Sequence, residues 1–158
     1  CGIERRPSRA ERVRIDDEGV CVALADGETL RPGALVLATG KHVGGGIAVE
    51  HGEPRETLAG LPIWSEGAPL PLASSGRGRD PRALFGDDPF SPGAGFAMGV
   101  GWDELLRPLD AHGSVASRAL FACGALLDGA SSSDGTGLGV AATTGWLAGR
   151  NAAARAGR

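Results

Sequence analysis

The residues with the clearest chemical potential are the small ones at 135–139. This stretch reads Gly-Thr-Gly-Leu-Gly and opens an Ala-rich segment that continues to about Asn151. The first turn of a helix carries unpaired N–H groups and the positive end of the helix dipole, and glycines let an anion or a ring carbonyl reach them. We therefore expect an anion-binding helix start here. A glycine-rich cap used only for packing is the alternative.

Two common phosphate-binding motifs do not fit this segment. A P-loop needs Lys-Ser or Lys-Thr after its glycines, and neither follows Gly139. The first dinucleotide-binding fingerprint needs glycines directly after a strand and an acidic residue about 20 positions later, and the sequence meets neither condition. We therefore do not expect an NTPase.

A second candidate is the end of the apolar run at residues 34–38, which closes on Thr39 and Gly40. A run that is apolar at every position predicts a strand buried on both faces, as in a parallel sheet covered by helices. Small residues at the carboxyl end of such a strand leave a crevice for a nucleotide. This strand end is therefore a predicted ligand site.

Candidate substrate contacts follow this strand end and recur later in the chain. Lys41 and His42 come directly after Gly40, and three glycines at 44–46 would let a substrate or a ring approach closely. His42 could donate a hydrogen bond to a ligand oxygen, or simply cap a turn. Arg107 has a planar donor fork that can clamp phosphate, although arginine beside proline is often only structural. We take His42 and Arg107 as the candidate catalytic residues.

The elements ahead of the first strand end form a predicted meander. Apolar residues alternate with polar or smaller ones at 13–15 and 20–24, and the polar residues 16–19 form a turn between them. Asp26-Gly27 is a strong hairpin dipeptide, and residues 28–30 are the predicted return strand.

The elements around the second candidate site are a strand and a helix. Residues 119–123 form another short apolar run, closed by Gly124, and residues 135–151 predict a helix. One side of this helix can carry Val140, Thr143, Thr144 and Leu147. Between the two sites, residues 60–101 are dense in Pro and Gly and predict an ordered, irregular insert.

Composition excludes several classes of protein. The net charge is -3 and no basic stripe is present, which argues against nucleic-acid binding. No apolar run approaches the roughly 20 residues of a membrane-spanning helix. Cys1, Cys21 and Cys123 are far apart, so we expect no metal site and a reduced, cytoplasmic setting. Glycine, however, makes up 27 of 158 residues, which favours close approach of backbone to a ligand.

Four pieces of the chain, in order, resemble the B-type subunit of anaerobic glycerol-3-phosphate dehydrogenase, within the FAD-dependent oxidoreductase superfamily. They are LATGKHVGGGIAVEHG, PRETLAGLPIW, LRPLDAHGSVASRALFACGALLDG and GTGLGVAATTGWLAG. The resemblance implies an α/β fold, namely the carboxyl-terminal part of a two-dinucleotide-fold, Rossmann-like flavoprotein with a β-hairpin or meander. It implies three regions: a meander and returning strand at 1–59, a substrate-side insert at 60–112, and the flavin-binding strand and helix at 113–158.

The same resemblance implies a flavin, either FAD or FMN. The implied cofactor-binding residues are Ala38, Thr39, Gly40, Gly124, Gly135, Thr136, Gly137, Leu138, Gly139 and Val140. Two departures stand out: the βαβ unit with G-x-G-x-x-G is absent, and position 125 is Ala where many relatives have Asp bonded to the ribityl chain. The chain also begins Cys1-Gly2, with its only Met at position 98. We therefore expect a fragment that binds flavin weakly or not at all alone.

The implied reaction is oxidation of sn-glycerol 3-phosphate to dihydroxyacetone phosphate, with electrons passed to a quinone. The implied partners are catalytic, iron–sulfur and membrane-anchor subunits, which would bring a cytoplasmic chain to the inner face of the cell membrane without direct insertion. Two alternatives stay open. One is another FAD-dependent dehydrogenase or reductase of the fumarate reductase-like superfamily, and the other is a non-catalytic flavin- or anion-binding module.

Overall fold

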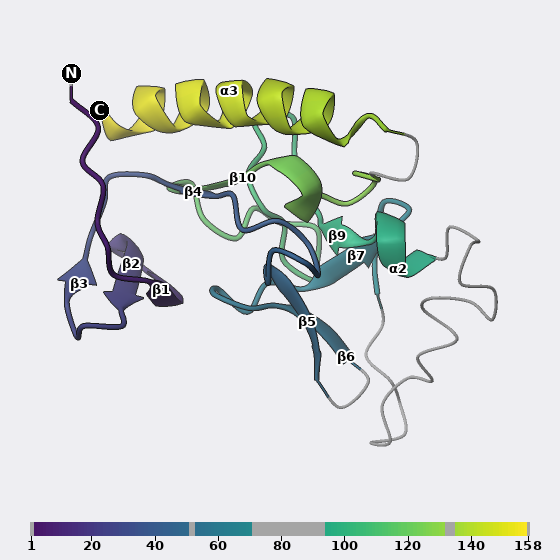
Figure 1. Cartoon of the computed structure of the whole chain (residues 1–158), viewed down its shortest axis with the longest axis horizontal. Coiled ribbons are helices and arrows are strands. Elements are labelled where there is room, and N and C mark those ends of the chain that lie inside the picture. The colour runs from purple at the N-terminus through teal and green to yellow at the C-terminus, as the bar shows by residue number, and fades with distance from the viewer. Residues whose placement is uncertain (1, 51–52, 71–93, 132–134, 158) are drawn as a thin grey trace.

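The computed structural model describes residues 2–50, 53–70, 94–131 and 135–157. Small sheets combine with helices, so the fold is α/β in the coarse sense (Figure 1). The strands are β1 (Ala10–Asp16), β2 (Gly19–Leu24), β3 (Thr29–Leu30), β4 (Leu35–Leu37), β5 (Ile47–Glu50), β6 (Glu53–Glu56), β7 (Ile63–Ser65), β8 (Ala68–Pro69), β9 (Gly99–Val100) and β10 (Leu120–Ala122). The helices are α2 (Ala94–Ala97), the 3-10 helix η1 (Gly124–Leu126) and α3 (Gly137–Ala156).

The predicted meander is confirmed as the antiparallel sheet β1-β2-β3. Strands β1 and β2 pair from Ala10↔Leu24 to Asp16↔Gly19, because the alternating apolar residues place Val13, Val20 and Val22 in the core. The turn closes when Asp16 accepts a hydrogen bond from the Glu18 N–H (3.1 Å). This sheet lies at the left of the molecule in Figure 1.

The two apolar runs predicted as buried strands pair with each other. β4 and β10 are parallel, with Leu35 opposite Leu120 and Leu37 opposite Ala122. The Cys123 N–H donates to the Leu37 carbonyl (3.0 Å), so the pairing continues to the carboxyl end of β4. Helix α3 packs over both strands and η1 (Figure 1).

Helix α3 begins two residues later than predicted and extends five residues further. Ala148 and Ala152 are buried, and Thr144 and Leu147 are partly buried on the same inward side. Thr143 is exposed, so it lies at the edge of the side on which the sequence groups it with Val140, Thr144 and Leu147. The 100° step per residue in a helix places position 143 away from the stripe formed by 144, 148 and 152. In the described ranges, no helix combines the length and apolar character needed to cross a membrane.

The predicted irregular insert contains regular elements. β7 pairs with β8 and β9, and α2 directly precedes β9. Met98 and Val100 of this region are fully buried together with Leu120 and Leu126 of the β10 region, so the insert shares the main core. Residues 71–93 of the insert lie outside the described residues.

Candidate functional site

The carboxyl ends of β4 and β10 lie side by side and both turn at glycine. Gly40 has φ +72° and Gly124 has φ +70°, a left-handed conformation that glycine adopts without steric cost. Both chain segments therefore leave the parallel pair at its carboxyl edge, where ligands of parallel α/β sheets bind. The structure brings together two of the three segments that the sequence singled out.

A threonine ties the β10 turn to the third segment, the start of α3. The Gly124 N–H donates to Thr144 Oγ1 (2.8 Å), and that hydroxyl donates to the Val140 carbonyl (2.6 Å). A Cβ at Gly124 would lie 3.8 Å from the Ala141 Cβ. The first turns of α3 are therefore held beside the end of β10. Thr144 was not among the predicted site residues, because nothing in the sequence distinguishes it from Thr143.

The start of α3 is open to solvent. Leu138 is 84% exposed, and a Cβ at Gly139 would meet no heavy atom within 4 Å. The Val140 N–H already bonds to the Thr136 carbonyl (3.0 Å), and the Thr136 side chain does not cap the helix. Gly135 adopts φ +79° just before the first turn. Because a helix start leaves its earliest N–H groups without intrahelical partners, this turn can donate to an anion or a carbonyl.

The 44–46 loop uses its glycines differently from the prediction. A Cβ at Gly44 would overlap the Thr39 carbonyl, and a Cβ at Gly46 would overlap the Gly40 carbonyl. The close approach is therefore to the chain's own backbone rather than to a substrate. This packing covers Thr39, whose Oγ1 atom is buried without a hydrogen-bond partner. A buried hydroxyl of this kind is a polar group that a ligand could satisfy.

Lys41 is the only lysine of the chain, and it anchors the end of β4. Its ammonium group donates to the carbonyls of Phe96 and Ala130, both at 2.8 Å. Burial lowers the pKa of Lys41 to about 8, against an opposing influence of the Asp128 carboxylate. Lys41 therefore joins three segments distant in sequence, a role that the sequence alone did not reveal.

His42 lies beside Lys41 and contacts the same neighbouring segment. Its Nε2 lies 2.9 Å from the Gly95 carbonyl oxygen. A carbonyl oxygen only accepts, so Nε2 carries the hydrogen in this contact. This contact of His42 therefore ties the β4 end to α2.

A groove of about 570 Å³ opens next to Thr39. It is lined by Arg9, Ala10, Glu11, Thr39, Gly44, Gly45, Thr57 and Leu58. These residues come from Arg9 and the start of β1, the β4 end, the 44–46 loop and the segment after β6. The groove reaches Thr39, whereas the start of α3 is not part of its lining.

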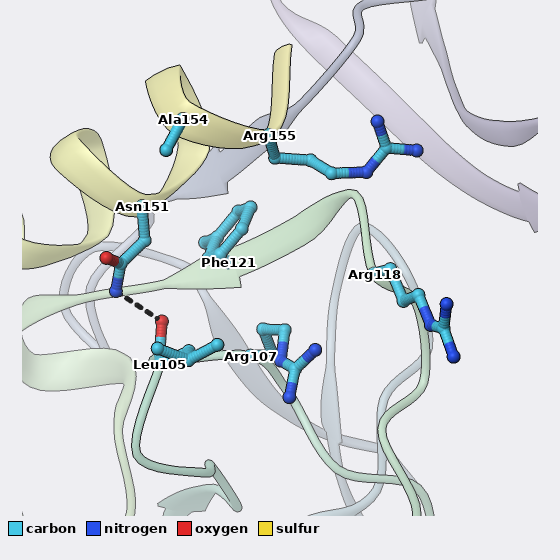
Figure 2. A pocket seen from close by; sticks show the side chains of 7 residues that line it. All are labelled: Leu105, Arg107, Arg118, Phe121, Asn151, Ala154 and Arg155. Carbon is cyan, nitrogen blue, oxygen red and sulfur yellow. Dashed lines mark hydrogen bonds between the residues drawn. The ribbon is translucent and has the colours of Figure 1, made fainter. Parts of the chain in front are cut away.

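Arg107 lines a different pocket from Thr39, although its neighbour Leu106 accepts a hydrogen bond from the Ala122 N–H at the end of β10 (2.9 Å). The Arg107 Nε and Nη2 donate to Asp103 Oδ2 at 2.8 and 2.5 Å. Burial raises the pKa of Asp103, but hydrogen bonds from Arg107 outweigh it and leave this pKa below its usual range. Arg107 lines a pocket with Asn151 and Arg155 of the last turns of α3 (Figure 2). The structure therefore does not bring His42 and Arg107 together.

The chemical groups near the strand ends can be compared with the hydrogen-bonding groups at the ring end of a flavin. N–H groups of the first turn of α3, which no Thr136 side-chain bond caps, suit an electron-rich ring carbonyl. The buried Thr39 hydroxyl lines a groove that contains no residue of α3. Gly40 and Gly124 form the turns at the two strand ends, but Gly124 is buried and its N–H is already bonded to Thr144. Among the described residues, no three His, Cys, Asp or Glu side chains group closely enough to hold a metal ion.

No family model and no solved structure matches this chain. A flavoprotein assignment therefore depends on the motifs in the sequence and on the geometry of the two strand ends.

Proposed function

We propose that this chain is part of a flavin-dependent oxidoreductase and holds the pyrimidine and ribityl end of FAD or FMN. The observation that carries this proposal is the parallel pairing of β4 and β10, whose carboxyl ends both turn at glycine. Helix α3 starts close by and is tied to Gly124 through Thr144. In a Rossmann-like flavoprotein, these are the positions that the motifs of this chain are expected to occupy.

In this proposal the chain orients the flavin ring and stabilises negative charge on its reduced form. A bound flavin would supply hydride and electron transfer. Backbone N–H groups of the first turn of α3 would donate to a ring carbonyl, where they stabilise negative charge on the reduced ring.

The first experiment measures flavin retention by the gene product that contains this chain. We expect a flavin absorbance band after purification or after addition of FAD or FMN. Gly139→Trp should weaken flavin binding at least about tenfold, because it places a large ring over the exposed helix start without meeting any protein atom at its Cβ. Gly149→Trp is the matched control, since it lies in the same helix and also meets open space.

Two results would count against the flavin proposal. One is a folded protein that stays colourless with either flavin added. The other is equal flavin retention in Gly139→Trp and Gly149→Trp, which would remove the helix start from the flavin site.

We further propose sn-glycerol 3-phosphate as the substrate, with electrons leaving through partner subunits to a quinone. This choice is supported by the order of the four resembling sequence pieces. The purified complex should reduce an artificial dye with sn-glycerol 3-phosphate and not with glycerol, because the phosphate is expected to orient the substrate. Dye reduction by another alcohol or acid alone would keep the flavin proposal and discard this substrate.

A non-catalytic anion-binding module is the second candidate function. It is favoured by one observation: the start of α3 is exposed and lies outside the lining of the groove beside Thr39, so an anion alone could bind it. A colourless protein that binds an anion at the start of α3 would support this candidate over the first.

A further inference from the structure

Three arginines from two segments of the chain line one pocket beside the carboxyl-terminal end of α3. The pocket has a volume of about 460 Å³ and is lined by Leu105, Arg107, Arg118, Phe121, Asn151, Ala154 and Arg155. Arg107 and Arg118 belong to the segment between β9 and β10, and Arg155 belongs to the last turn of α3. In Figure 2 all three arginine side chains extend on the same side of Phe121.

The pocket is built by specific contacts rather than by chance proximity of surface chains. The Asn151 side-chain amide donates to the Leu105 carbonyl (3.0 Å) and joins α3 to the segment that carries Arg107. Leu106 is buried and has φ +62°, a strained conformation for a residue with a side chain. Asp103 Oδ1 accepts from the Arg107 N–H (2.9 Å), which fixes the backbone at the strained turn.

The charges at the pocket do not cancel. Asp103 neutralises Arg107, with 2.5 Å between Asp103 Oδ2 and Arg107 Nη2. Arg118 and Arg155 form no ion pair within the part of the chain that the structure describes.

An acidic turn, Asp16 to Glu18, lies next to the same two arginines. It shares a neighbouring groove with Arg118 and Arg155. Two of its carboxylates, those of Asp16 and Glu18, are held by Arg31 at 3.1 and 3.2 Å. Asp17, the third carboxylate of the turn, lines the same groove, but among the described residues no carboxylate is paired with Arg118 or Arg155.

Phosphate is the ligand chemistry that suits this arrangement. Guanidinium groups bind phosphate oxygens with two parallel hydrogen bonds, and two or three such groups match the several oxygens of one phosphate. Phe121, Leu105 and Ala154 add an apolar wall, which suits the carbon part of an organic phosphate better than a free inorganic ion.

We infer that this pocket, which we call the arginine pocket, binds the phosphate group of a small organic phosphate. Arg118 and Arg155 contact the phosphate, and Arg107, held by Asp103, lines the inner side. Arg155 lies sixteen residues beyond Gly139 on α3, which is about 24 Å along the helix axis. A phosphate bound here is therefore separate from any ligand at the start of α3. The arginine pocket is a second site whether or not the proposed flavin function holds.

Calorimetric titration with phenyl phosphate at fixed ionic strength tests this site. We expect measurable binding of phenyl phosphate and weaker binding of inorganic phosphate. Arg118→Ala and Arg155→Ala should each lower the affinity for phenyl phosphate at least about tenfold, because a hydrogen-bonded charge pair is lost in each. Both residues are exposed, so the variants should fold. Arg107 is left unchanged because its removal would leave Asp103 unpaired.

Arg150→Ala is the matched control. It removes the same charge from the same helix, but Arg150 packs over Trp146 at 4.8 Å from the ring centroid and is not part of the pocket lining. An equal loss of affinity in Arg150→Ala would show a diffuse charge effect and overturn the inference. Failure of wild-type protein to bind phenyl phosphate would overturn it as well. The titration uses no flavin, so its failure does not affect the proposed function.

Discussion

Replacing Gly46 with alanine is expected to destabilise the protein by about 3 kcal/mol or more. The new Cβ would overlap the Gly40 carbonyl and lie 2.5 Å from Thr39 Oγ1. The backbone around Gly46 is fixed, since its N–H donates to the Lys41 carbonyl (2.9 Å) and its carbonyl accepts from Thr57 (3.1 Å). A clash with backbone cannot be relieved by a side-chain rotation, so the β4 end must move. Chemical denaturation followed by circular dichroism measures the effect.

Gly149→Ala, in contrast to Gly46→Ala, is expected to increase the stability of the protein. Gly149 lies inside α3, and a Cβ there meets no heavy atom within 4 Å. Alanine should therefore stabilise the protein by up to about 1 kcal/mol through helix propensity. If Gly46→Ala proved as stable as wild type, the 44–46 loop would not pack on Thr39 and Gly40 as described.

The packing at Gly46 shows what the sequence could and could not predict at the candidate site. The turns at Gly40 and Gly124, which end the buried strands β4 and β10, were predictable from the sequence. A short apolar run closed by glycine indicates a buried strand followed by a turn. The run at 44–46 was also conspicuous, but glycine allows any close approach. Whether that approach is to a ligand or to the chain's own backbone depends on tertiary structure.

The elements with a clear periodicity were predicted best. Strands β1 and β2 alternate between apolar and polar residues, and α3 follows a long stretch of helix-forming alanines. The hairpin β5–β6 was not predicted, because β6 reads Glu-Pro-Arg-Glu and has no apolar alternation. It forms around Pro54 and Glu56, which are both buried. Burial of a glutamate is uncommon, and only its hydrogen-bond partners explain it.

Residues that act through distant contacts were not predictable. Lys41 joins the β4 end to α2 and to Ala130. The arginine pocket needs residues 107, 118 and 155 to meet, and it forms only when α3 packs over β10. One sequence provides residue types along the chain, whereas these sites depend on how segments fold against one another.

Glu56 holds the turn at residues 56–59, which contacts both the 44–46 loop and strand β1 of the β1-β2-β3 sheet. Its carboxylate is 1% exposed and accepts from the N–H groups of Leu58 (3.0 Å) and Ala59 (2.6 Å). Within this turn, Thr57 donates its hydroxyl to the Gly45 carbonyl (2.7 Å). The Leu58 carbonyl accepts from the Val13 N–H (2.8 Å). One buried carboxylate therefore orders a turn that joins two parts of the molecule.

Glu56→Ala is expected to lower the free energy of unfolding by about 3 kcal/mol, because two N–H donors lose their acceptor and each such loss costs about 1–3 kcal/mol. Glu56→Gln should lower the free energy of unfolding by less. Its amide oxygen can still accept from one of the two N–H groups, whereas its NH₂ group would face the other N–H and cannot accept from it. Glu104→Ala, at an exposed glutamate, is the control and should change stability by at most about 0.5 kcal/mol. Amide hydrogen exchange should quicken at Val13 and Gly46 in Glu56→Ala, because both N–H groups lie in segments held by the turn. Unchanged exchange at both positions, together with a stability loss, would mean that Glu56 supports the core locally and does not hold the 44–46 loop.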